Sequence, residues 1–246
     1  MMVILRSLLF HGVLTALTIT LGILSPLLAL LPEKSQSRFI GACTTGVIHA
    51  LRICCGLRYR VHGMDNLHRG RQDRCIVMAK HTSTWETLFF QHLLRSPVWV
   101  LKRELLTIPF FGWILAVLKP IAIDRSAGKQ ALDNIIRQSR ERLSAHRPLV
   151  IFPEGTRSTA GQRAQYKLGG AVVARKTGAT VIPIAHNAGW FWPSGGLRIY
   201  PGTVHVVIGK PIPGPHRHSA QLMAEVESWI EHTVADLPRR HCEANR

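Results

Sequence analysis

Residues 75–94 read CIVMAKHTSTWETLFFQHLL and predict a β-strand that leads directly into a helix. The run 75–79 is short and wholly apolar, which is typical of a strand buried on both faces. Residues 85–94 have helical apolar spacing, and the hydroxyl side chains just before them suit a helix N-cap. A buried strand followed by a helix is the building unit of α/β proteins.

The same alternation continues along the chain. Further strands are predicted at 98–101, 120–123, 149–152, 181–185 and 204–208, and helices at 109–118, 128–145, 168–177 and 219–237. Apolar strands joined by crossover helices indicate a parallel sheet covered on both faces. The region 193–214 is expected to add antiparallel edge strands. The predicted fold class is therefore α/β, with a mixed, mostly parallel sheet covered by helices.

The N-terminus has a different character. Residues Ser7 to Leu31 are almost wholly apolar and long enough to cross a bilayer, with a kink expected at Gly22 and Pro26. The stretch is long for a signal peptide, and no small-residue cleavage site follows it. Residues 39–57 form a second, amphipathic stretch.

The chain is accordingly divided into N-terminal membrane-anchoring helices, residues 1–57, and an α/β domain, residues 58–246. Whether the N-terminal helices span the membrane or lie in one leaflet is left open by the sequence.

The composition favours a globular protein with anionic partners. Of 246 residues, 46% are hydrophobic and 18% are charged, which fits neither a disordered chain nor a polytopic membrane protein. The net charge is +17, from 31 Lys and Arg against 14 Asp and Glu. These cations are dispersed and no nucleic-acid motif accompanies them, so a membrane surface and phosphate groups are favoured over nucleic acid.

The cysteines and histidines do not suggest a metal site. The 5 cysteines form no CxxC pair, which argues against a disulfide framework and a zinc site and fits a reducing compartment. His216 and His218 are the one close histidine pair, and no further ligands lie near them in sequence. No metal is therefore expected.

A candidate acid–base pair follows the strand at 75–79. His81 lies just ahead of the next helix and Glu86 in its first turn, so the two side chains can converge. A carboxylate on one imidazole nitrogen fixes the tautomer, and the other nitrogen can then take a proton from a hydroxyl group. Taken alone, the pair is weak evidence, because a capping histidine beside a surface glutamate is the more common reason for this spacing.

A second polar cluster, Phe152-Pro153-Glu154-Gly155-Thr156-Arg157-Ser158, also follows a strand. Gly155 allows a close backbone approach to a ligand or a positive φ. Arg157 offers a planar guanidinium suited to phosphate oxygens, and Thr156 and Ser158 add hydroxyl groups.

Two further clusters follow strands in the same way. Lys102 and Arg103 end one predicted strand, and Asp124 and Arg125 end another. Each could be an ordinary solvated charge. Together, the four clusters describe one rim of one sheet, at the strand ends where α/β proteins bind ligands. That rim suits a hydroxyl nucleophile on a substrate that carries phosphate.

These motifs carry a family resemblance. HTSTWE at 81–86 resembles the HX4D box of glycerolipid acyltransferases, and FPEGTRS at 152–158 resembles their most distinctive box. The remaining matches are KREL at 102–105, AIDR at 122–125, YKLG at 166–169 and VIPI at 181–184. Order and spacing agree from about Tyr59 to Lys210, most closely with the bacterial 1-acylglycerol-3-phosphate acyltransferase group.

The resemblance implies a role for each matched position. His81 would be the general base and Glu86 would orient it. The acceptor phosphate would be bound by Glu154, Gly155, Thr156 and Arg157, with help from Lys102 or Arg103. Arg125, Lys167 and Pro183 would also belong to the site, and Pro183 would shape its acyl-donor side. The family box usually ends in Asp, so the longer Glu86 requires the local backbone to compensate.

The implied reaction moves a fatty acyl chain from acyl-CoA or acyl-carrier protein to the sn-2 hydroxyl of lysophosphatidic acid, forming phosphatidic acid without a metal or prosthetic group. The implied location is the cytoplasmic face of the bacterial inner membrane, among membrane lipids. Three alternatives remain. The acceptor is another lyso-lipid, such as a lyso-ornithine lipid; or the protein is a lipid hydrolase; or it is a non-catalytic lipid-binding protein.

Overall fold

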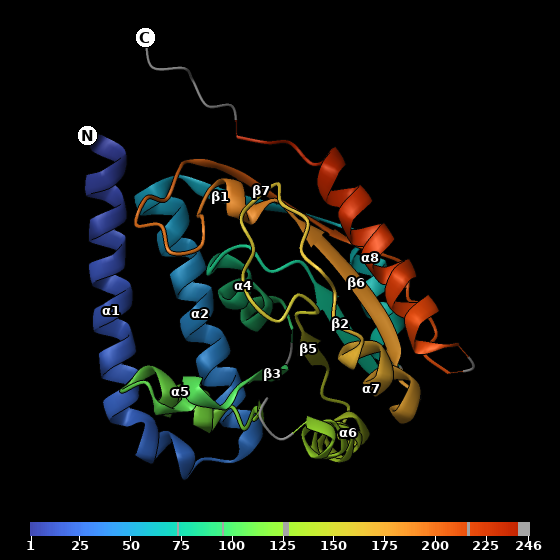
Figure 1. Ribbon diagram of the computed structural model, residues 1–246. Coiled ribbons are helices and arrows are strands. Elements are labelled where there is room, and N and C mark those ends of the chain that lie inside the picture. The colour runs from blue at the N-terminus through green and yellow to red at the C-terminus, as the bar shows by residue number, and fades with distance from the viewer. Residues whose placement is uncertain (73, 95, 125–127, 216, 241–246) are drawn as a thin grey trace.

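The computed structural model describes residues 1–246 except 73, 95, 125–127, 216 and 241–246. Within the described residues, seven strands form one sheet in the order β1-β7-β6-β2-β5-β3-β4 (Figure 1). The strands are β1 (Leu57–His62), β2 (Cys75–Ala79), β3 (Val98–Lys102), β4 (Ile121–Ile123), β5 (Leu149–Ile151), β6 (Thr180–His186) and β7 (Gly202–Ile208).

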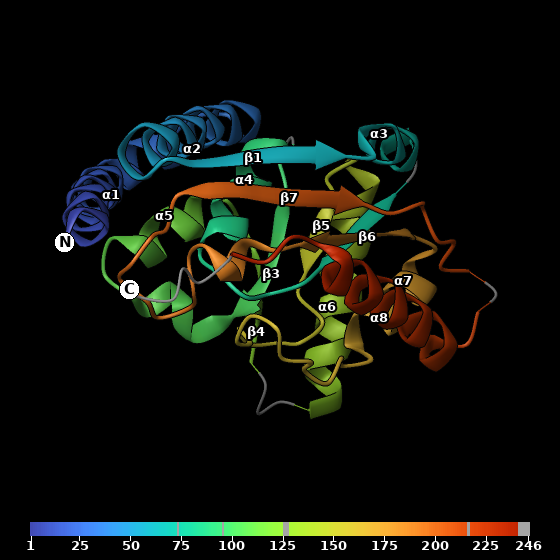
Figure 2. The same ribbon diagram turned by 90° about the horizontal axis from the view of Figure 1, so that it is seen from above.

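The sheet is mixed and mostly parallel, as predicted. Strands β6, β2, β5, β3 and β4 all run in one direction. Strand β7 is antiparallel to β6, and β1 runs parallel to β7 along the outer edge (Figure 2). The antiparallel direction predicted within 193–214 is therefore confirmed, but its edge position is wrong, because β1 from the other end of the chain covers β7.

Helices cover both faces of the sheet. The α-helices are α1 (Met2–Ala29), α2 (Glu33–Cys55), α3 (Met64–Gln72), α4 (Trp85–Leu93), α5 (Phe111–Val117), α6 (Gly128–Ser144), α7 (Gly169–Thr177) and α8 (Ser219–Asp236), and a 3₁₀ helix spans Arg103–Thr107. In β2, Cys75, Val77 and Ala79 join the buried cluster formed with α1, α2 and α4. Ile76 and Met78 join the cluster formed with α6, α7 and α8. The apolar strands predicted from sequence thus serve two cores, one on each face.

The two N-terminal helices pack against the α/β domain and against each other (Figure 1). Phe10 of α1 and Leu51 of α2 belong to the same buried cluster as the sheet residues. Gly22 lies against α5, and a Cβ atom there would come within 2.6 Å of the Phe110 Cα atom. Glu33 at the start of α2 forms an ion pair with Arg147, just before β5. Helix α1 runs unbroken through Pro26.

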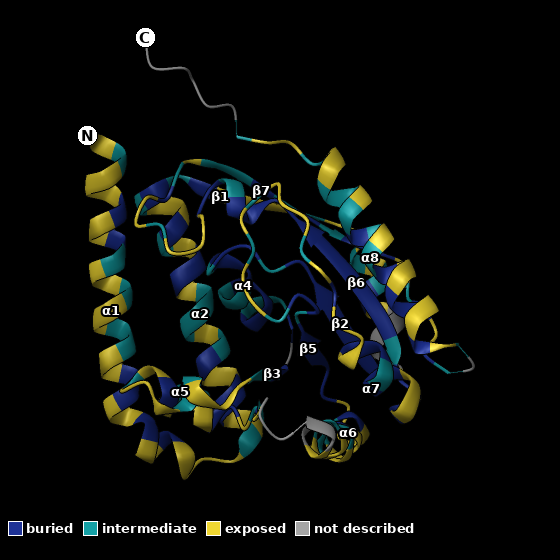
Figure 3. Cartoon of the chain, viewed as in Figure 1, coloured by how far each residue is buried: buried dark blue, intermediate teal, exposed yellow. Residues whose placement is uncertain are grey.

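The outward face of α1 is apolar and exposed (Figure 3). Leu5, Leu9 and Leu27 have 68%, 62% and 64% of their surface exposed. Within the described residues, α1 is the one helix long and apolar enough to cross a membrane. The predicted division between residues 57 and 58 falls one residue inside β1, and both N-terminal helices share a core with the sheet. The anchoring role of residues 1–57 stays a prediction.

Candidate active site

The chain segments that follow β2, β5 and β3 lie along one edge of the sheet. These three strands are parallel, with β5 between β2 and β3, so their carboxyl ends meet at the same edge. The HTSTWE segment follows β2, the FPEGTRS segment follows β5, and Lys102 is the last residue of β3. The rim expected from sequence is therefore one continuous edge in the structure.

His81 and Glu86 are in direct contact at this edge. The His81 Nδ1 atom lies 2.9 Å from the Glu86 Oε1 atom. Oε1 also accepts hydrogen bonds from the backbone N–H groups of Thr82, at 2.9 Å, and Ser83, at 2.8 Å. The longer side chain of glutamate is accommodated because it folds back over the amides that precede α4.

The charge on Glu86 determines which nitrogen of His81 carries the proton. Burial raises the pKa of Glu86, but hydrogen bonds from His81 and the Ser83 N–H, together with the nearby imidazoles, bring it below its ordinary value. Glu86 is therefore ionised at neutral pH and can only accept. Nδ1 of His81 must therefore carry a hydrogen, and in the neutral imidazole Nε2 has the lone pair that can take a substrate proton.

The HTSTWE and FPEGTRS segments are locked together by hydrogen bonds. The His81 N–H donates to Glu154 Oε1 at 2.9 Å, and the Ser158 N–H donates to the His81 carbonyl at 2.8 Å. The rings of His81 and Phe152 are stacked with centroids 3.9 Å apart. The imidazole is thus oriented by its backbone, by Glu86 and by an aromatic face.

Glu154 points into the protein, away from solvent. It is 3% exposed and lies between the His81 N–H and the Lys80 ammonium group, 3.6 Å from Nζ. Burial raises the pKa of Glu154, against the lowering effect of the hydrogen bonds from Ser158 and His81 and the charge on Lys80. A carboxyl group in this position holds the loop, and it offers no positive charge to a phosphate.

Arg157 and Thr156 lie on the exposed side of the same loop. The Arg157 Nε–H donates to the Ser83 carbonyl at 3.1 Å, and its terminal amino groups form no hydrogen bond or ion pair with the described residues. Gly155 has φ of 71°, and its N–H closes a turn onto the Phe152 carbonyl at 3.0 Å. The turn therefore sets an exposed guanidinium beside the HTSTWE segment that carries His81.

The other predicted cations are spread along the rim. Lys102 ends β3 and Arg103 begins the 3₁₀ helix, and both side chains are exposed. Lys167 is exposed, and its N–H donates to the Pro153 carbonyl at 2.9 Å. Arg125 lies outside the described residues.

Pro183 lies away from the rim, buried in the middle of β6 opposite Met78 of β2. Its carbonyl accepts the Gly209 N–H at 2.9 Å, just beyond the end of β7. Its missing N–H costs little, because the β6–β7 ladder ends at Ile208. Its expected role on the acyl-donor side stays a prediction.

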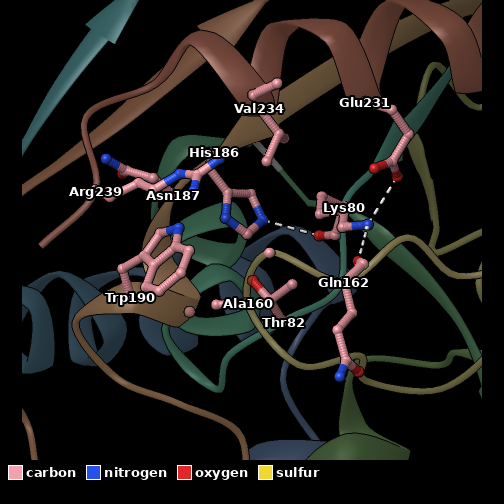
Figure 4. Close-up of a pocket in the computed structure, with 13 residues that line it drawn as sticks. Lys80, Thr82, Ala160, Gln162, His186, Asn187, Trp190, Glu231, Val234 and Arg239 are labelled. Carbon is pink, nitrogen blue, oxygen red and sulfur yellow. Dashed lines mark hydrogen bonds and ion pairs between the residues drawn. The ribbon is translucent and has the colours of Figure 1, made fainter.

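Sequence reasoning missed three residues behind the loop that carries His81 (Figure 4). Lys80, Glu231 and His186 line a cavity of about 90 Å³ beneath it. Lys80 is 1% exposed and its Nζ atom lies 2.7 Å from Glu231 Oε1 on α8. The Lys80–His81 sequence offered one local signal, a lysine at the end of a buried strand. No signal pointed to Glu231, which lies 151 residues away.

In the part of the chain that the structure describes, no group of three or more His, Cys, Asp or Glu side chains could hold a metal ion.

The comparisons with known proteins identify the class. The sequence model of the acyltransferase family matches residues 58–187, which includes His81, Glu86 and the FPEGTRS loop. The chain belongs to the acyltransferase family.

Individual relatives agree with this class. A "1-acyl-sn-glycerol-3-phosphate acyltransferase" from Pseudomonas aeruginosa is 42% identical over 239 residues, covering 94% of this chain and 91% of that protein. One of the same description from Chlamydomonas reinhardtii is 32% identical over 149 residues, covering 60% of this chain and 44% of its own length.

The fold also has a solved counterpart. The crystal structure of the 1-acyl-sn-glycerophosphate (LPA) acyltransferase PlsC from Thermotoga maritima has a TM-score of 0.78 and 22% identity to this chain, with 95% of each chain covered. This likeness supports the α/β architecture, including the placement of the N-terminal helices.

Proposed function

We propose that this protein transfers a fatty acyl chain from an acyl thioester to the sn-2 hydroxyl of lysophosphatidic acid, forming phosphatidic acid. The observation that carries the proposal is the contact of 2.9 Å between His81 Nδ1 and the ionised, buried Glu86, beside the exposed Arg157. The relatives described as 1-acyl-sn-glycerol-3-phosphate acyltransferases support the choice of acceptor.

In the proposed reaction, Nε2 of His81 removes the proton from the acceptor hydroxyl as its oxygen attacks the thioester carbonyl. The imidazolium that forms is stabilised by Glu86 through Nδ1–H. The tetrahedral intermediate collapses, the carbon–sulfur bond breaks, and His81 returns its proton to the leaving sulfur. The thioester is already activated, so the step needs no metal or prosthetic group.

Arg157 is the proposed anchor for the acceptor phosphate. Its Nε–H is held by the Ser83 carbonyl, two residues from His81. The sn-2 hydroxyl and the phosphate of lysophosphatidic acid are separated by only a few bonds, so a phosphate site next to the base suits this acceptor. Lys102 and Arg103 add positive charge farther along the rim. Both acyl-CoA and acyl-carrier protein are candidate donors.

The proposed location is the cytoplasmic face of the bacterial inner membrane, with α1 lying in one leaflet. Helix α1 is attached to the domain near both ends. Ser7 Oγ accepts the Ile199 N–H at 2.8 Å, and Gly22 packs on Phe110 of the loop before α5. A spanning helix would have to leave these contacts. With α1 lying in one leaflet, its apolar outward face enters the lipid, and the net charge of +17 favours binding to an anionic membrane surface.

The membrane proposal can be tested by cell fractionation. Glutamates in place of Leu9 and Leu27, which are 62% and 64% exposed, should shift the protein toward the soluble fraction without loss of fold. Glutamates at Asn134 and Arg137, exposed on α6, provide the matched control. Equal membrane recovery of both variants would contradict insertion of this face.

The activity can be tested with the full chain purified in detergent, labelled long-chain acyl-CoA and lysophosphatidic acid, comparing the wild type with His81→Ala. Phosphatidic acid made by the wild type alone is the expected result. If no product forms, acyl-carrier protein as donor and lyso-lipids with other head groups are supplied in turn. Release of free fatty acid alone, lost in His81→Ala, would replace the proposal with a hydrolase.

A further inference from the structure

We infer that Glu231 of the C-terminal helix α8 is a positioning residue for catalysis, acting through Lys80 to hold the backbone of His81. This inference rests on the proposed function. It assigns a role in the reaction to a helix that lies outside residues 58–187, the part matched by the family model.

Lys80 is restrained at each of its polar groups. Its N–H donates to the Ile184 carbonyl at 3.3 Å, and its carbonyl accepts from His186 Nε2 at 2.8 Å. Its ammonium group lies 2.7 Å from Glu231 Oε1 and donates to the Gln162 carbonyl at 3.2 Å (Figure 4). The residue next to His81 is therefore attached to strand β6, to the loop before α7 and to helix α8.

The tautomer of His186 follows from its contacts. Its Nδ1 atom accepts the Ala188 N–H at 3.3 Å, so Nε2 carries the hydrogen and donates to Lys80. Burial lowers the pKa of His186. The ring is thus a neutral donor, fixed in orientation, and it holds the carbonyl group that precedes His81.

A chain of polar contacts connects α8 to His81 through the carboxyl groups of Glu231 and Glu154, with Lys80 between them. Glu231 Oε1 meets Lys80 Nζ, which in turn lies 3.6 Å from Glu154 Oε1. That same Glu154 oxygen accepts the His81 N–H. Because Lys80 is the shared cation, loosening its contact with Glu231 lets the ammonium group and Glu154 shift, and the His81 backbone shifts with them.

Glu231 is itself held in place. Tyr166 O–H donates to Glu231 Oε1 at 2.9 Å, and burial together with the nearby carboxylates raises the pKa of this tyrosine. The segment after α8 is tied to the sheet, since Asn187 Nδ2 donates to the Pro238 carbonyl at 2.7 Å. Helix α8 is therefore a fixed support behind the loop.

The same helix supplies a matched control one turn earlier. Glu227 also bonds a cation from the loop before α7, but that cation is Arg163, whose side chain is 70% exposed. The Lys80 side chain, in contrast, is 1% exposed. Both pairs join α8 to the rest of the domain, and only the Lys80 pair leads to His81.

The test compares Glu231→Gln with Glu227→Gln in the full chain. Misplacement of reacting groups by about 1 Å costs about 10²-fold in rate, so partial loosening in Glu231→Gln should lower kcat by about tenfold. KM for both substrates should stay within about twofold, because no substrate contacts Glu231 in the proposed site. Melting temperatures are measured for both variants, and Glu227→Gln should retain wild-type kcat.

Hydrogen–deuterium exchange provides a readout that needs no activity. In Glu231→Gln, the amides of His81 to Ser83 should exchange about tenfold faster than in the wild type, while those of β2 stay protected. Glu227→Gln should leave both regions unchanged. A wild type that is inactive with acyl-CoA and with acyl-carrier protein as donor would reject the proposed function, and the exchange result would still decide on Glu231. Equal exchange and equal kcat in the two variants, or a change in KM alone, would overturn the inference.

Discussion

The two halves of the proposed catalytic rim differ in how they are built. In one half, the HTSTWE and FPEGTRS segments are joined by backbone and side-chain hydrogen bonds around His81. In the other half, Lys102 and Arg103 project into solvent from the end of β3, without an ion pair among the described residues. The sequence presents both halves alike, as polar clusters that follow apolar strands.

The difference indicates what each half can contribute. Proton transfer depends on distance and angle, so it requires groups that are already oriented. Attraction of an anion depends only on nearby positive charge, which exposed side chains provide. Substitutions in the interlocked half should therefore have large effects on turnover, and those in the open half should have small effects that depend on salt.

The largest effect is expected at the centre of the interlocked half. His81→Ala should lower kcat by about 10²–10⁴-fold, the usual contribution of a general base. The measurement is product formation from acyl thioester and lysophosphatidic acid at saturating substrate. Ser83→Ala is the control, because the Ser83 hydroxyl accepts the Trp85 N–H and takes no part in proton transfer in this scheme. An equal loss in Ser83→Ala would contradict the assignment of the base.

A somewhat smaller effect is expected at the boundary between the two halves. Arg157→Ala should raise KM for lysophosphatidic acid about 10–100-fold, because a hydrogen bond to a charged group contributes about 1.5–3 kcal/mol. Use of an acceptor without phosphate, such as a monoacylglycerol, should change little. Arg163→Ala, an exposed arginine in the same connection, is the matched control. A parallel loss with both acceptors would argue against phosphate binding by Arg157.

The open half should respond weakly. Lys102→Ala and Arg103→Ala should each lower kcat/KM by about two- to fivefold at low ionic strength, with the difference disappearing at high salt. Rates measured across a salt series test this expectation. Arg137→Ala on α6, an exposed cation that is paired with Glu141 and does not follow a strand end, should have no effect. A loss that persists at high salt would indicate a direct, desolvated contact instead.

The smallest effect concerns stability and pH. The pKa of Glu86 in the folded protein lies below its ordinary value of 4.5, so its ionised form stabilises the native state. That contribution is complete above the unfolded pKa and is lost as pH falls through the lower, folded value. The difference in unfolding free energy between wild type and Glu86→Gln should therefore narrow below about pH 4.5. Denaturation curves from pH 6 downward would measure it.

That comparison includes its own check. Burial raises the pKa of Glu154, so this carboxyl contributes a pH dependence of the opposite sign. Its stabilising effect is present at low pH and is lost as pH rises through the folded value. Glu154→Gln should therefore gain stability relative to wild type as pH rises. If the unfolding free energies of Glu86→Gln and Glu154→Gln relative to wild type changed in parallel with pH, the environments of the two carboxyl groups would not be distinct.

Local sequence determined the order of strands, loops and helices in this protein and the contact between His81 and Glu86. The apolar run at β2 and the polar residues that follow it were enough to predict a strand, a polar loop and a helix in the right order, because side-chain periodicity and capping act over a few residues. Parallel strands then placed the loops on one edge. The His81–Glu86 contact was predictable for the same reason, since the two residues lie within one turn and its preceding loop.

Only the tertiary structure decided the rest. Strand β1 lies beside β7, and Glu231 meets Lys80 across 151 residues of sequence, because packing brings together segments that no local pattern connects. The inward direction of Glu154 likewise depends on Lys80 and the His81 N–H lying within reach. Local sequence specified the chemical groups of this site, and long-range packing determined which of them face a substrate and which hold the others in place.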